Sequence, residues 1–525
     1  MKRRHLILLA ILLVGGWLRF QSLDAKCLWL DEAISWRLAR YPLPEVVKRS
    51  AHPFEGSPPL YYVLLSLWAA VAGDSEFALR SPSAAAGLAT VLGMYCFVRE
   101  LTALGPPGSD RPPHGGATWP APLAAALTAV SVLQIHNARQ VRMYSTAAAL
   151  LAWGGWALLK GLRRGRGAGA FWLLYAVLAL AACYTHTLAP LTVAAQLLFA
   201  VVFLSAASWT RPPGRGSERR PLAEVLRPWA WPSVAVLVIA VGYAPWVGAF
   251  REKAEEAGRN YWMGPLSLSG VLKETFAATA GPFPAPWPAQ AAGGLAAILL
   301  LAAAFVSFAR GRRGWAGAYL LATALAPAGL MLGYSAYSGR SLFHSRYLSF
   351  VQLDWLASLA VFVAGLGPRL RTAAAVGGAF LWGLVLLPCS WGLIGPAAEP
   401  GMRGAFEYVA SRRRPGDIVV AQNSFTFLPA SYYGRHEARP VLFSEVPSRQ
   451  LQAAAPFLDD GDLVTPHQLI DDGPTGLWWV SSSSYGDRAG VGVHLPGVWL
   501  ATDREEFGQD NAWEGPVVVE TLRKD

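Results

Sequence analysis

The first 20 residues, MKRRHLILLAILLVGGWLRF, set a pattern that the rest of the chain repeats. Basic residues at positions 2–4 precede an apolar run from Leu6 to Leu18. A helix that crosses a bilayer needs about 20 mainly apolar residues, and flanking positive charge favours the cytoplasmic side. A cleaved signal peptide would carry a small-residue cleavage site, which is absent before Arg19 and Phe20. We therefore predict an uncleaved first membrane helix with a cytoplasmic N-terminus.

The composition of the whole chain indicates many such helices. Of its 525 residues, 53% are hydrophobic and 15% are charged, whereas soluble domains carry about 25% charged residues. This balance excludes a cytosolic globular enzyme, a disordered chain and a collagen-like repeat. We predict a mainly α, polytopic membrane protein with about eleven transmembrane helices. The expected spans begin near Leu6, Leu79, Trp119, Met143, Ala170, Thr187, Trp229, Ala291, Gly314, Tyr347 and Thr372.

The basic turns between these spans predict the orientation. Residues 160–166, 211–227, 310–313 and 369–371 contain 4, 5, 3 and 2 Lys or Arg, so we expect them in the cytoplasm. This parity requires that the short apolar segment 58–72, which opens with two prolines, re-enters the outer leaflet without crossing. The C-terminal residues then lie outside. The net charge of +11 is explained by these turns and does not indicate a nucleic-acid partner.

A change of composition near residue 393 predicts two domains. We assign residues 1–393 to the membrane domain and residues 394–525, with a net charge of −7, to a soluble extracytoplasmic α/β domain. In the latter we expect a helix at 403–413 and strands at 418–421, 440–443, 477–481 and 517–521. No phosphate-binding loop or nucleophile elbow is present in its sequence. The cysteines at 27, 96, 183 and 389 lack metal-site spacing and are expected to be buried thiols.

Two adjacent carboxylates, Asp31 and Glu32, follow the first predicted span. Acids in a lipid-adjacent, water-poor cleft are costly, so such a pair is a candidate for proton transfer or cation binding. The alternative is that Asp31 caps a helix running to Arg40. Both interpretations can hold together.

Basic and aromatic side chains recur at the outer ends of later spans. Arg139 and Arg142, followed by Tyr144, would share one face of a predicted helix, and forked guanidinium donors suit a phosphate. Each arginine alone is as well explained as a lipid-headgroup anchor. A lone histidine such as His186 is more often structural than catalytic. A second group of the same kind precedes the tenth span and consists of Arg340, His344, Arg346 and Tyr347.

The order of these motifs resembles the bacterial family 39 glycosyltransferases of the GT-C superfamily, which includes protein O-mannosyltransferases and aminoarabinose transferases. The likeness runs through most of residues 1–350, and residues 402–433 resemble the extracytoplasmic tail of many bacterial members. The family's usual histidine before Pro-Pro-Leu is Ser57 here, so its role is not carried over. The motifs are Asp31-Glu32, SPPLYY (57–62), GDSEFALR (73–80), ARQVRMY (138–144), YTH (184–186) and HSRYL (344–348).

The resemblance implies inverting transfer of a sugar from a polyprenyl-phosphate donor to a hydroxyl of a lipid, glycan or protein, at the outer face of the bacterial inner membrane. It implies that Asp31 is the catalytic base and that Glu32 orients it or holds a divalent cation; metal use differs among relatives, so the metal is left open. Donor-phosphate contacts would come from Arg139, Arg142, Tyr144 and Arg346. Other substrate contacts would come from Tyr61, His186, Arg340, His344 and Tyr347.

Three other classes of protein remain open from the sequence. A polymerase or ligase would use pyrophosphate-linked glycans on the same face. A transporter or flippase would also have many spans, although we find no inverted repeat and only Asp354 as an acid at the centre of a span. A membrane receptor without enzymatic activity would tolerate loss of Asp31.

Overall fold

The computed structural model describes residues 2–106, 119–164, 167–210, 226–260, 263–281, 287–381, 392–444, 454–470, 474, 476–483, 499–510 and 514–524. Contacts divide the chain into two compact units. The helical unit comprises residues 1–21 and 81–394, and the mixed unit comprises residues 22–80 and 395–525. The long loop after the first helix thus belongs to the same unit as the C-terminal residues.

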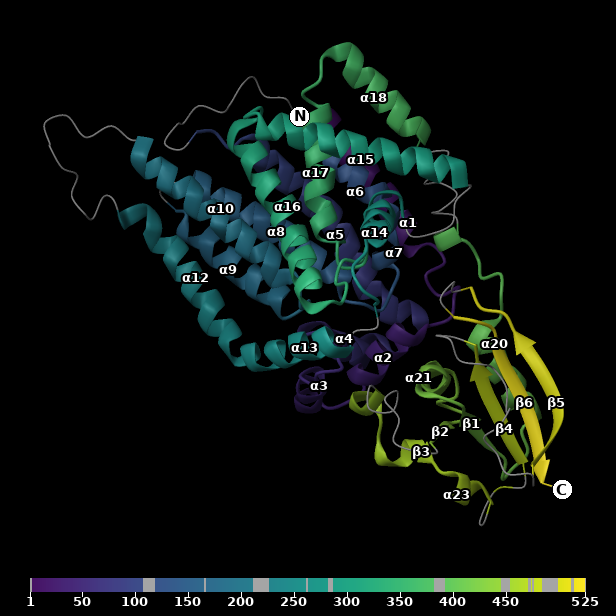
Figure 1. The fold of residues 1–525 in the computed structure, drawn as a ribbon. Helices are drawn as coiled ribbons and strands as arrows, with labels where there is room; N and C mark the ends of the chain where they lie inside the picture. The colour runs from purple at the N-terminus through teal and green to yellow at the C-terminus, as the bar shows by residue number, and fades with distance from the viewer. Residues whose placement is uncertain are drawn as a thin grey trace, which may run out of the picture. The chain divides into compact units, whose positions relative to one another are not determined.

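The helical unit is built from long apolar helices that pack on one another (Figure 1). Its helices are α1 (Lys2–Phe20), α5 (Glu76–Thr102, from Ser81 onward), α6 (Pro120–Val130), α7 (Val132–Ala138), α8 (Tyr144–Arg163), α9 (Gly169–Cys183), α10 (Ala189–Thr210), α12 (Ala230–Tyr243), α13 (Val247–Asn260), α14 (Leu268–Ala280), α15 (Trp287–Ala309), α16 (Gly314–Ser338), α17 (Val351–Val363) and α18 (Pro368–Leu381).

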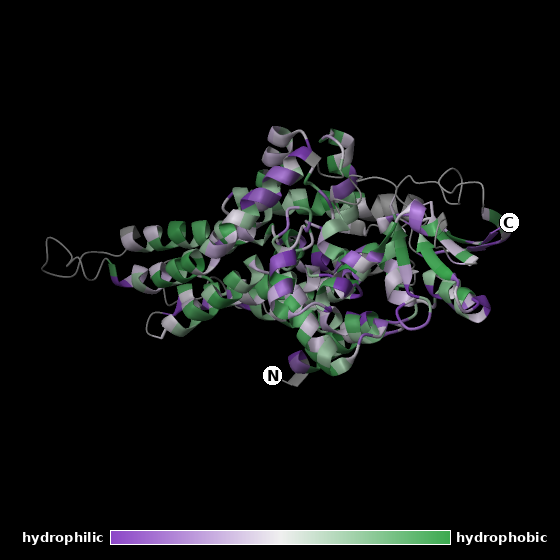
Figure 2. Cartoon of the chain, turned by 90° about the horizontal axis from the view of Figure 1, so that it is seen from below, coloured by the Kyte–Doolittle hydropathy of each residue, from purple (hydrophilic) through white to green (hydrophobic). Residues whose placement is uncertain are grey.

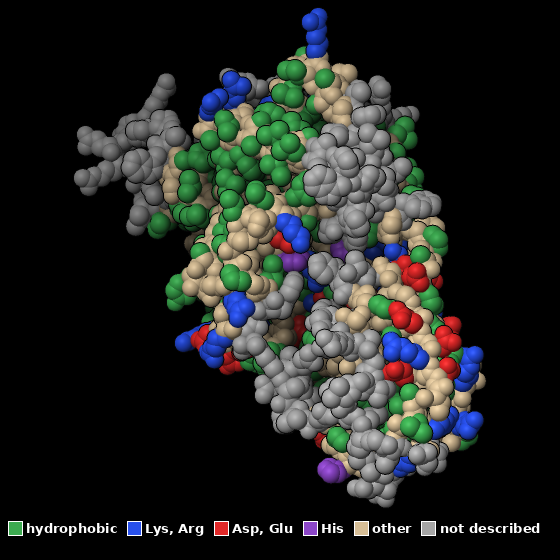
Figure 3. Space-filling view, turned by 45° about the vertical axis from the view of Figure 1, so that its right-hand side comes forward, with side chains coloured by type: hydrophobic (Ala, Val, Ile, Leu, Met, Phe, Trp, Pro, Cys, Tyr) green, Lys and Arg blue, Asp and Glu red, His purple; other side chains and the backbone are tan. Residues whose placement is uncertain are grey.

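These helices are coloured mainly as hydrophobic in Figure 2, and apolar side chains gather on the outer surface of the unit in Figure 3. Helix α10, for example, buries Phe199 and Phe203 but exposes Leu198 and Val202. Apolar residues on both sides of a helix are expected where one side packs on protein and the other on lipid. The fold is that of a multi-pass membrane protein, as the composition predicts.

The number of spans is less sharply defined. Four described helices are long and apolar enough to cross a membrane, and the pair α6 and α7, bent by 60°, would make a fifth. A described helix lies at or near each of the eleven predicted starts, but several of these helices are too short to span by themselves. Eleven crossings therefore stay a prediction. The bend follows Ser131, which caps α7 by accepting a hydrogen bond from the N–H of Gln134.

Small residues let the helices approach closely at two points. A Cβ on Gly155 of α8 would lie 3.2 Å from Phe97 of α5 and 3.2 Å from the Tyr319 hydroxyl of α16. A Cβ on Gly87 of α5 would lie 2.6 Å from Ala138 Cβ and 2.9 Å from Arg19 Nε. Arg19, which is fully buried, donates to the carbonyl oxygens of residues 15, 128 and 129. Close helix packing through small residues is common in membrane proteins.

The mixed unit contains a six-stranded sheet in the order β3-β2-β1-β4-β6-β5 (Figure 1). The first four strands are parallel, and β6 pairs antiparallel with both β4 and β5. Its elements are α2 (Leu30–Ala39), α3 (Leu43–Ser50), α4 (Leu60–Ala72), α20 (Gly401–Arg412), β1 (Ile418–Ala421), α21 (Ser424–Tyr433), β2 (Pro440–Phe443), β3 (Leu463–Val464), α23 (Pro466–Ile470), β4 (Gly476–Ser482), β5 (Trp499–Phe507) and β6 (Val517–Lys524).

The predicted α/β character of the C-terminal region is confirmed. Strands β1 and β2 have the expected bounds, while β4 and β6 extend beyond them. Strand β5 was not predicted, because residues 500–506 are all exposed and largely polar, so the strand lacks an alternating apolar pattern. Of the described cysteines, Cys183 is buried, whereas Cys27 and Cys96 are half-buried free thiols. Cys389 lies outside the described residues.

Candidate functional site

Asp31 lies in the first turn of α2, in the mixed unit. The helix begins at Leu30, and Trp29 is its N-cap. The backbone N–H of Trp29 donates to Glu32 Oε2 at 3.4 Å, so Glu32 reaches back over the first turn. The expectation that Asp31 caps the helix is therefore wrong, because it follows the cap by two positions. Asp31 is half-buried, and its charge lies at the helix end that favours anions.

Glu32 is held in a buried ion pair with Arg80. Arg80 Nε donates to Glu32 Oε1 at 2.8 Å, and its Nη2 donates to Oε2 at 2.6 Å. The side chain of Glu32 is only 1% exposed and that of Arg80 only 5%. A bidentate pair of this kind fixes both planes. Glu32 thereby anchors the first turn of α2, in which Asp31 also lies.

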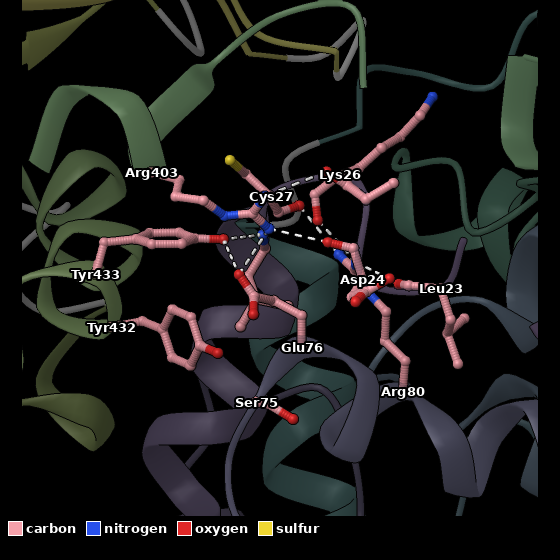
Figure 4. Close-up of polar contacts among 12 residues, drawn as sticks. Leu23, Asp24, Lys26, Cys27, Ser75, Glu76, Arg80, Arg403, Tyr432 and Tyr433 are labelled. Atoms are coloured by element: carbon pink, nitrogen blue, oxygen red, sulfur yellow. Dashed lines mark hydrogen bonds and ion pairs between the residues drawn. The ribbon is translucent and has the colours of Figure 1, made fainter. Parts of the chain in front are cut away.

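The loop before α2 is wrapped around the same arginine. Arg80 Nη1 donates to the carbonyl oxygens of Leu23 and Lys26, at 2.9 and 2.8 Å, and Nη2 donates to that of Cys27 at 3.0 Å (Figure 4). All of these acceptors are backbone oxygens, so the arginine holds the path of the chain rather than particular side chains. One guanidinium thus holds three carbonyl oxygens of the peptide that leads into the acidic pair.

A second arginine, Arg403 of α20, joins this loop to Glu76. Its Nη2 donates to the Asp24 carbonyl and to Glu76 Oε1, both at 2.9 Å (Figure 4). The Tyr433 hydroxyl of α21 donates to the same Glu76 oxygen at 3.2 Å and accepts from the N–H of Leu28 at 2.8 Å. Residues from both segments of the mixed unit therefore support residues 22–32, which we call the acidic loop because they end in Asp31 and Glu32.

Glu514 is a third acid beside the pair. Its Oε1 accepts from the N–H of Leu30 at 2.9 Å. Burial raises the pKa of Glu514 to about 7, and the charges of Asp31 and Glu32 raise it further in the same direction, against the opposing hydrogen bond from Leu30. No sequence pattern marks Glu514 as a site residue, because it lies in a polar stretch far along the chain.

Tyr61, predicted to contact substrate, lies on α4 of the mixed unit and is 2% exposed. Its ring packs edge-on against Tyr62, with 5.8 Å between centroids. The Tyr62 hydroxyl donates to Glu55 Oε1 at 2.9 Å. The segment predicted to re-enter the leaflet thus contains a 13-residue helix, and the two tyrosines in its first turn are buried.

Arg139 and Arg142 do not share a helix face in the helical unit, contrary to the prediction. Helix α7 ends at Ala138 and α8 begins at Tyr144, so both arginines lie in the turn between them. Arg139 Nη1 donates to the carbonyl oxygens of Arg19 and Gln21, at 3.3 and 2.6 Å. It therefore satisfies the last carbonyls of α1. Arg142 is buried, and its own carbonyl accepts from Ser83 Oγ at 3.1 Å.

His186 joins several predicted residues into one aromatic cluster. Its ring centroid lies 5.6 Å from that of Tyr144, 6.0 Å from Tyr347 and 5.2 Å from Phe350. His186 Nδ1 accepts from the N–H of Leu188 at 3.1 Å, which puts the ring proton on Nε2. Burial, and then the charge of Arg142, lower the pKa of His186 to about 3. Nε2 is buried and has no hydrogen-bond partner among the described residues.

His344 continues this cluster toward α14. Its ring centroid lies 5.8 Å from that of Tyr347, and its Nδ1 accepts from the N–H of Arg346 at 3.1 Å. Glu274 of α14 accepts from the N–H of Ser345 at 2.8 Å and lies 3.7 Å from His344 Nδ1. Burial outweighs this carboxylate and lowers the pKa of His344 to about 4. Arg340 is half-buried, and its carbonyl accepts from Ser338 Oγ at 3.2 Å.

The helical unit thus brings together, through neighbouring turns, the side chains of Arg142, Tyr144, His186, His344 and Tyr347. Arg139, which was predicted to join this group, instead contacts the end of α1. Within the described ranges, no three His, Cys, Asp or Glu side chains are grouped so that they could hold a metal ion. The supporting residues Arg80, Glu274 and Glu514 were missed, since isolated charges in a sequence carry no sign of a distant partner.

Neither a protein-family model nor a curated protein matches the sequence. Solved structures do match its fold. ArnT from Cupriavidus metallidurans bound to undecaprenyl phosphate has a TM-score of 0.59 at 14% identity, over 99% of this chain and 98% of that one. The apo state of ArnT gives 0.58 at 12% identity, again over 99% and 98%.

A more distant match is the archaeal oligosaccharyltransferase AglB from Archaeoglobus fulgidus, in complex with an inhibitory peptide and a dolichol-phosphate. Its TM-score is 0.50 at 13% identity, over 92% of this chain and 69% of that one. At identities this low, the match shows a shared fold but does not indicate a shared substrate. The fold expected from the order of the motifs is confirmed: the chain has the GT-C fold of membrane glycosyltransferases.

Proposed function

We propose that this protein transfers a monosaccharide from a polyprenyl-phosphate donor to an acceptor hydroxyl, with inversion at the anomeric carbon. The acceptor oxygen forms a bond to the anomeric carbon while the bond from that carbon to the phosphate oxygen breaks. Asp31 takes the hydroxyl proton, and the electron pair leaves with polyprenyl phosphate. The leaving group is already an anion of low basicity, so it needs charge stabilisation rather than a strong acid.

The observation that carries the proposal is the fold match over nearly the whole chain, to a protein captured with undecaprenyl phosphate. Asp31 supports it because it is a half-buried carboxylate in the first turn of α2, and a positioned carboxylate can take the hydroxyl proton. The buried Glu32–Arg80 pair supports it because it leaves Glu32 a positioning role and fixes the helix that carries Asp31.

The cluster in the helical unit supports a phosphate ligand. Arg142 supplies buried positive charge, and the neutral His186 offers an N–H donor at Nε2. Fixed donors in a water-poor site stabilise a phosphate more strongly than they would in water. We assign the donor phosphate to Arg142, Tyr144, His186 and Arg346. Arg340, His344 and Tyr347 are proposed to contact the rest of the donor.

The test compares the purified wild type with Asp31→Asn. Each is offered a panel of polyprenyl-monophosphate sugars with membrane extract as acceptor, and release of polyprenyl phosphate is followed. We expect release from one donor by the wild type and a loss of at least about 100-fold in the variant, the usual size of a general-base contribution. Asp24→Asn is the matched control, because Asp24 is an exposed acid of the same loop.

Two other results would change the assignment. Equal release by the wild type and Asp31→Asn would remove Asp31 as the base. Consumption of pyrophosphate-linked glycans but of no monophosphate donor would favour the polymerase or ligase. Dependence on a divalent cation is read from the same assay after treatment with a chelator. We place the reaction at the outer face of the bacterial inner membrane, where the orientation predicted from the basic turns puts the acidic loop.

A further inference from the structure

A pocket in the mixed unit involves none of the residues assigned to the proposed reaction. It has a volume of about 270 Å³ and lies between α2 and the segments that follow α20. Pockets for drug-sized ligands measure roughly 300–1,000 Å³, so this one suits a group the size of a single sugar. Its charged lining consists of Arg37, Arg40, Arg435, Arg439, Asp459 and Asp462.

Both aspartates of the pocket accept hydrogen bonds from other residues that line it, arginines among them. Asp462, whose side chain is 1% exposed, accepts from Arg37, from Arg439 at 3.1 Å and from the N–H of Asp459 at 2.8 Å. Asp459 accepts from Arg37 at 2.9 Å and from the Tyr41 hydroxyl at 2.9 Å. Four guanidiniums face two carboxylates, so the lining keeps a net positive charge.

The other two arginines are held by aromatic rings. The guanidinium carbon of Arg40 lies 5.0 Å from the ring centroid of Trp36, and that of Arg435 lies 3.9 Å from the centroid of Tyr432. Trp36 and Tyr432 also pack edge to face at 5.1 Å. A guanidinium stacked on a ring keeps its N–H groups at the edge free for hydrogen bonds.

These contacts leave part of the cationic surface unneutralised. Arg40 has no carboxylate partner among the described residues, and its side chain is exposed. Arg435 forms an ion pair with Asp74, whose Oδ2 lies 3.4 Å from Nε, and it also donates to the Tyr432 carbonyl, so Arg40 carries the larger part of the unneutralised charge. Pre-positioned forks of this kind match the oxygens of a phosphate or a carboxylate.

We propose that this pocket binds a saccharide unit through a phosphate or carboxylate group that the sugar carries. Arg40 and Arg435 contact the oxyanion, while Tyr41, Phe427 and Ser431 supply apolar surface and a hydroxyl to the sugar ring. A pocket that combines apolar walls with a few fixed polar groups is typical of small-ligand sites. The inference does not rest on the proposed glycosyl transfer, because binding is measured without turnover.

The test uses the full-length protein in nanodiscs and measures binding by calorimetry. Glucose 6-phosphate, glucuronate, glucose and inorganic phosphate are the four probes. We expect saturable binding of one or both anionic sugars, tighter than that of inorganic phosphate, and none of glucose. Arg40→Gln should weaken it by roughly tenfold or more, as expected for one lost charge-assisted hydrogen bond. Arg435→Gln should act in the same direction.

Arg412→Gln is the matched control. Arg412 stacks on Tyr408 at 4.0 Å in the same unit but does not line the pocket, so its loss should leave binding unchanged. Thermal unfolding of each variant checks that the unit is folded, and Arg37 is left intact because its ion pairs hold the wall. The proposal is overturned if neither anionic sugar binds, if inorganic phosphate binds as tightly as they do, or if both arginine variants bind like the wild type.

Discussion

The backbone N–H of Leu30 donates to Glu514 Oε1 over 2.9 Å, although the two residues are 484 positions apart. This bond ties the start of the helix that carries Asp31 to the strand-rich part of the mixed unit. Glu514 is a third carboxylate beside two others, and its burial raises its pKa to about 7 although this bond acts in the opposite direction.

Glu514→Gln should remove a pH dependence of stability. The pKa of Glu514 is raised from its ordinary value of 4.5 to about 7, so the folded state binds the extra proton between these values. Its stabilising contribution is therefore present below about pH 4.5 and is lost as the pH rises through 7. Because glutamine does not ionise, the variant should unfold at a higher temperature than the wild type at pH 8 but not at pH 5. Unchanged pH dependence would contradict this, and Glu506→Gln, on the exposed face of β5, is the control.

Glu32→Gln should destabilise the mixed unit strongly. It leaves the guanidinium of Arg80 buried without its carboxylate, which costs about 3–5 kcal/mol when one partner of a buried pair is removed. Denaturant unfolding, followed by tryptophan fluorescence, measures this loss. Glu45→Gln is the comparison, since Glu45 is 34% exposed and its pair with Arg49 should contribute at most about 1 kcal/mol. Equal effects of the two changes would refute a structural role for Glu32.

The hydrogen bond proposed from His186 Nε2 to the donor phosphate predicts a difference between two variants. Glutamine can place an N–H near the position of Nε2, whereas phenylalanine fills the same space without a donor. We expect His186→Phe to raise the KM for the polyprenyl-phosphate sugar by about tenfold and His186→Gln to recover most of this loss. The two variants should not differ in thermal stability by more than about 1 kcal/mol. If glutamine were no better than phenylalanine, the ring would be acting through packing alone.

Arg139 and Arg142 should differ in what they affect. Arg139 donates to carbonyl oxygens at the end of α1, so Arg139→Gln should lower stability by about 1.5–3 kcal/mol with little change in donor KM. Arg142→Gln should raise the donor KM, because its charge reaches the cluster around His186. Unfolding curves and steady-state kinetics on the same two preparations separate these effects. If both variants raised the donor KM by a similar factor, Arg139 and Arg142 would both act on the donor, as the sequence predicted.

The sequence predicted the fold well because apolar runs and turns are local signals. The helix starts, the strands at 418–421 and 440–443 and the α/β class all follow from patterns within about 20 residues. The break at Ser131 was missed because the apolar pattern continues through it. The end of α7 at Ala138 was missed as well, and it leaves Arg139 and Arg142 in the turn before α8.

For the candidate site, the sequence pointed to candidate residues but not to their partners. Positions at helix ends brought His186 and Tyr347 to notice, and the structure places their rings in contact. The partners of Glu32 and Leu30 lie 48 and 484 residues away. No pattern in a single sequence encodes such pairs, because each is fixed by tertiary packing.

The pairing of residues 22–80 with residues 395–525 also constrains the order in which a growing polypeptide can mature. At about 5–20 residues per second, Glu514 leaves the ribosome about 25–100 s after Leu30. Until then the peptide around the acidic pair lacks one of its anchors, and Arg37 lacks both of its aspartates. Cellular quality control therefore meets an unfinished mixed unit for most of the synthesis time, and substitutions near residue 514 should act as biogenesis defects as much as catalytic ones.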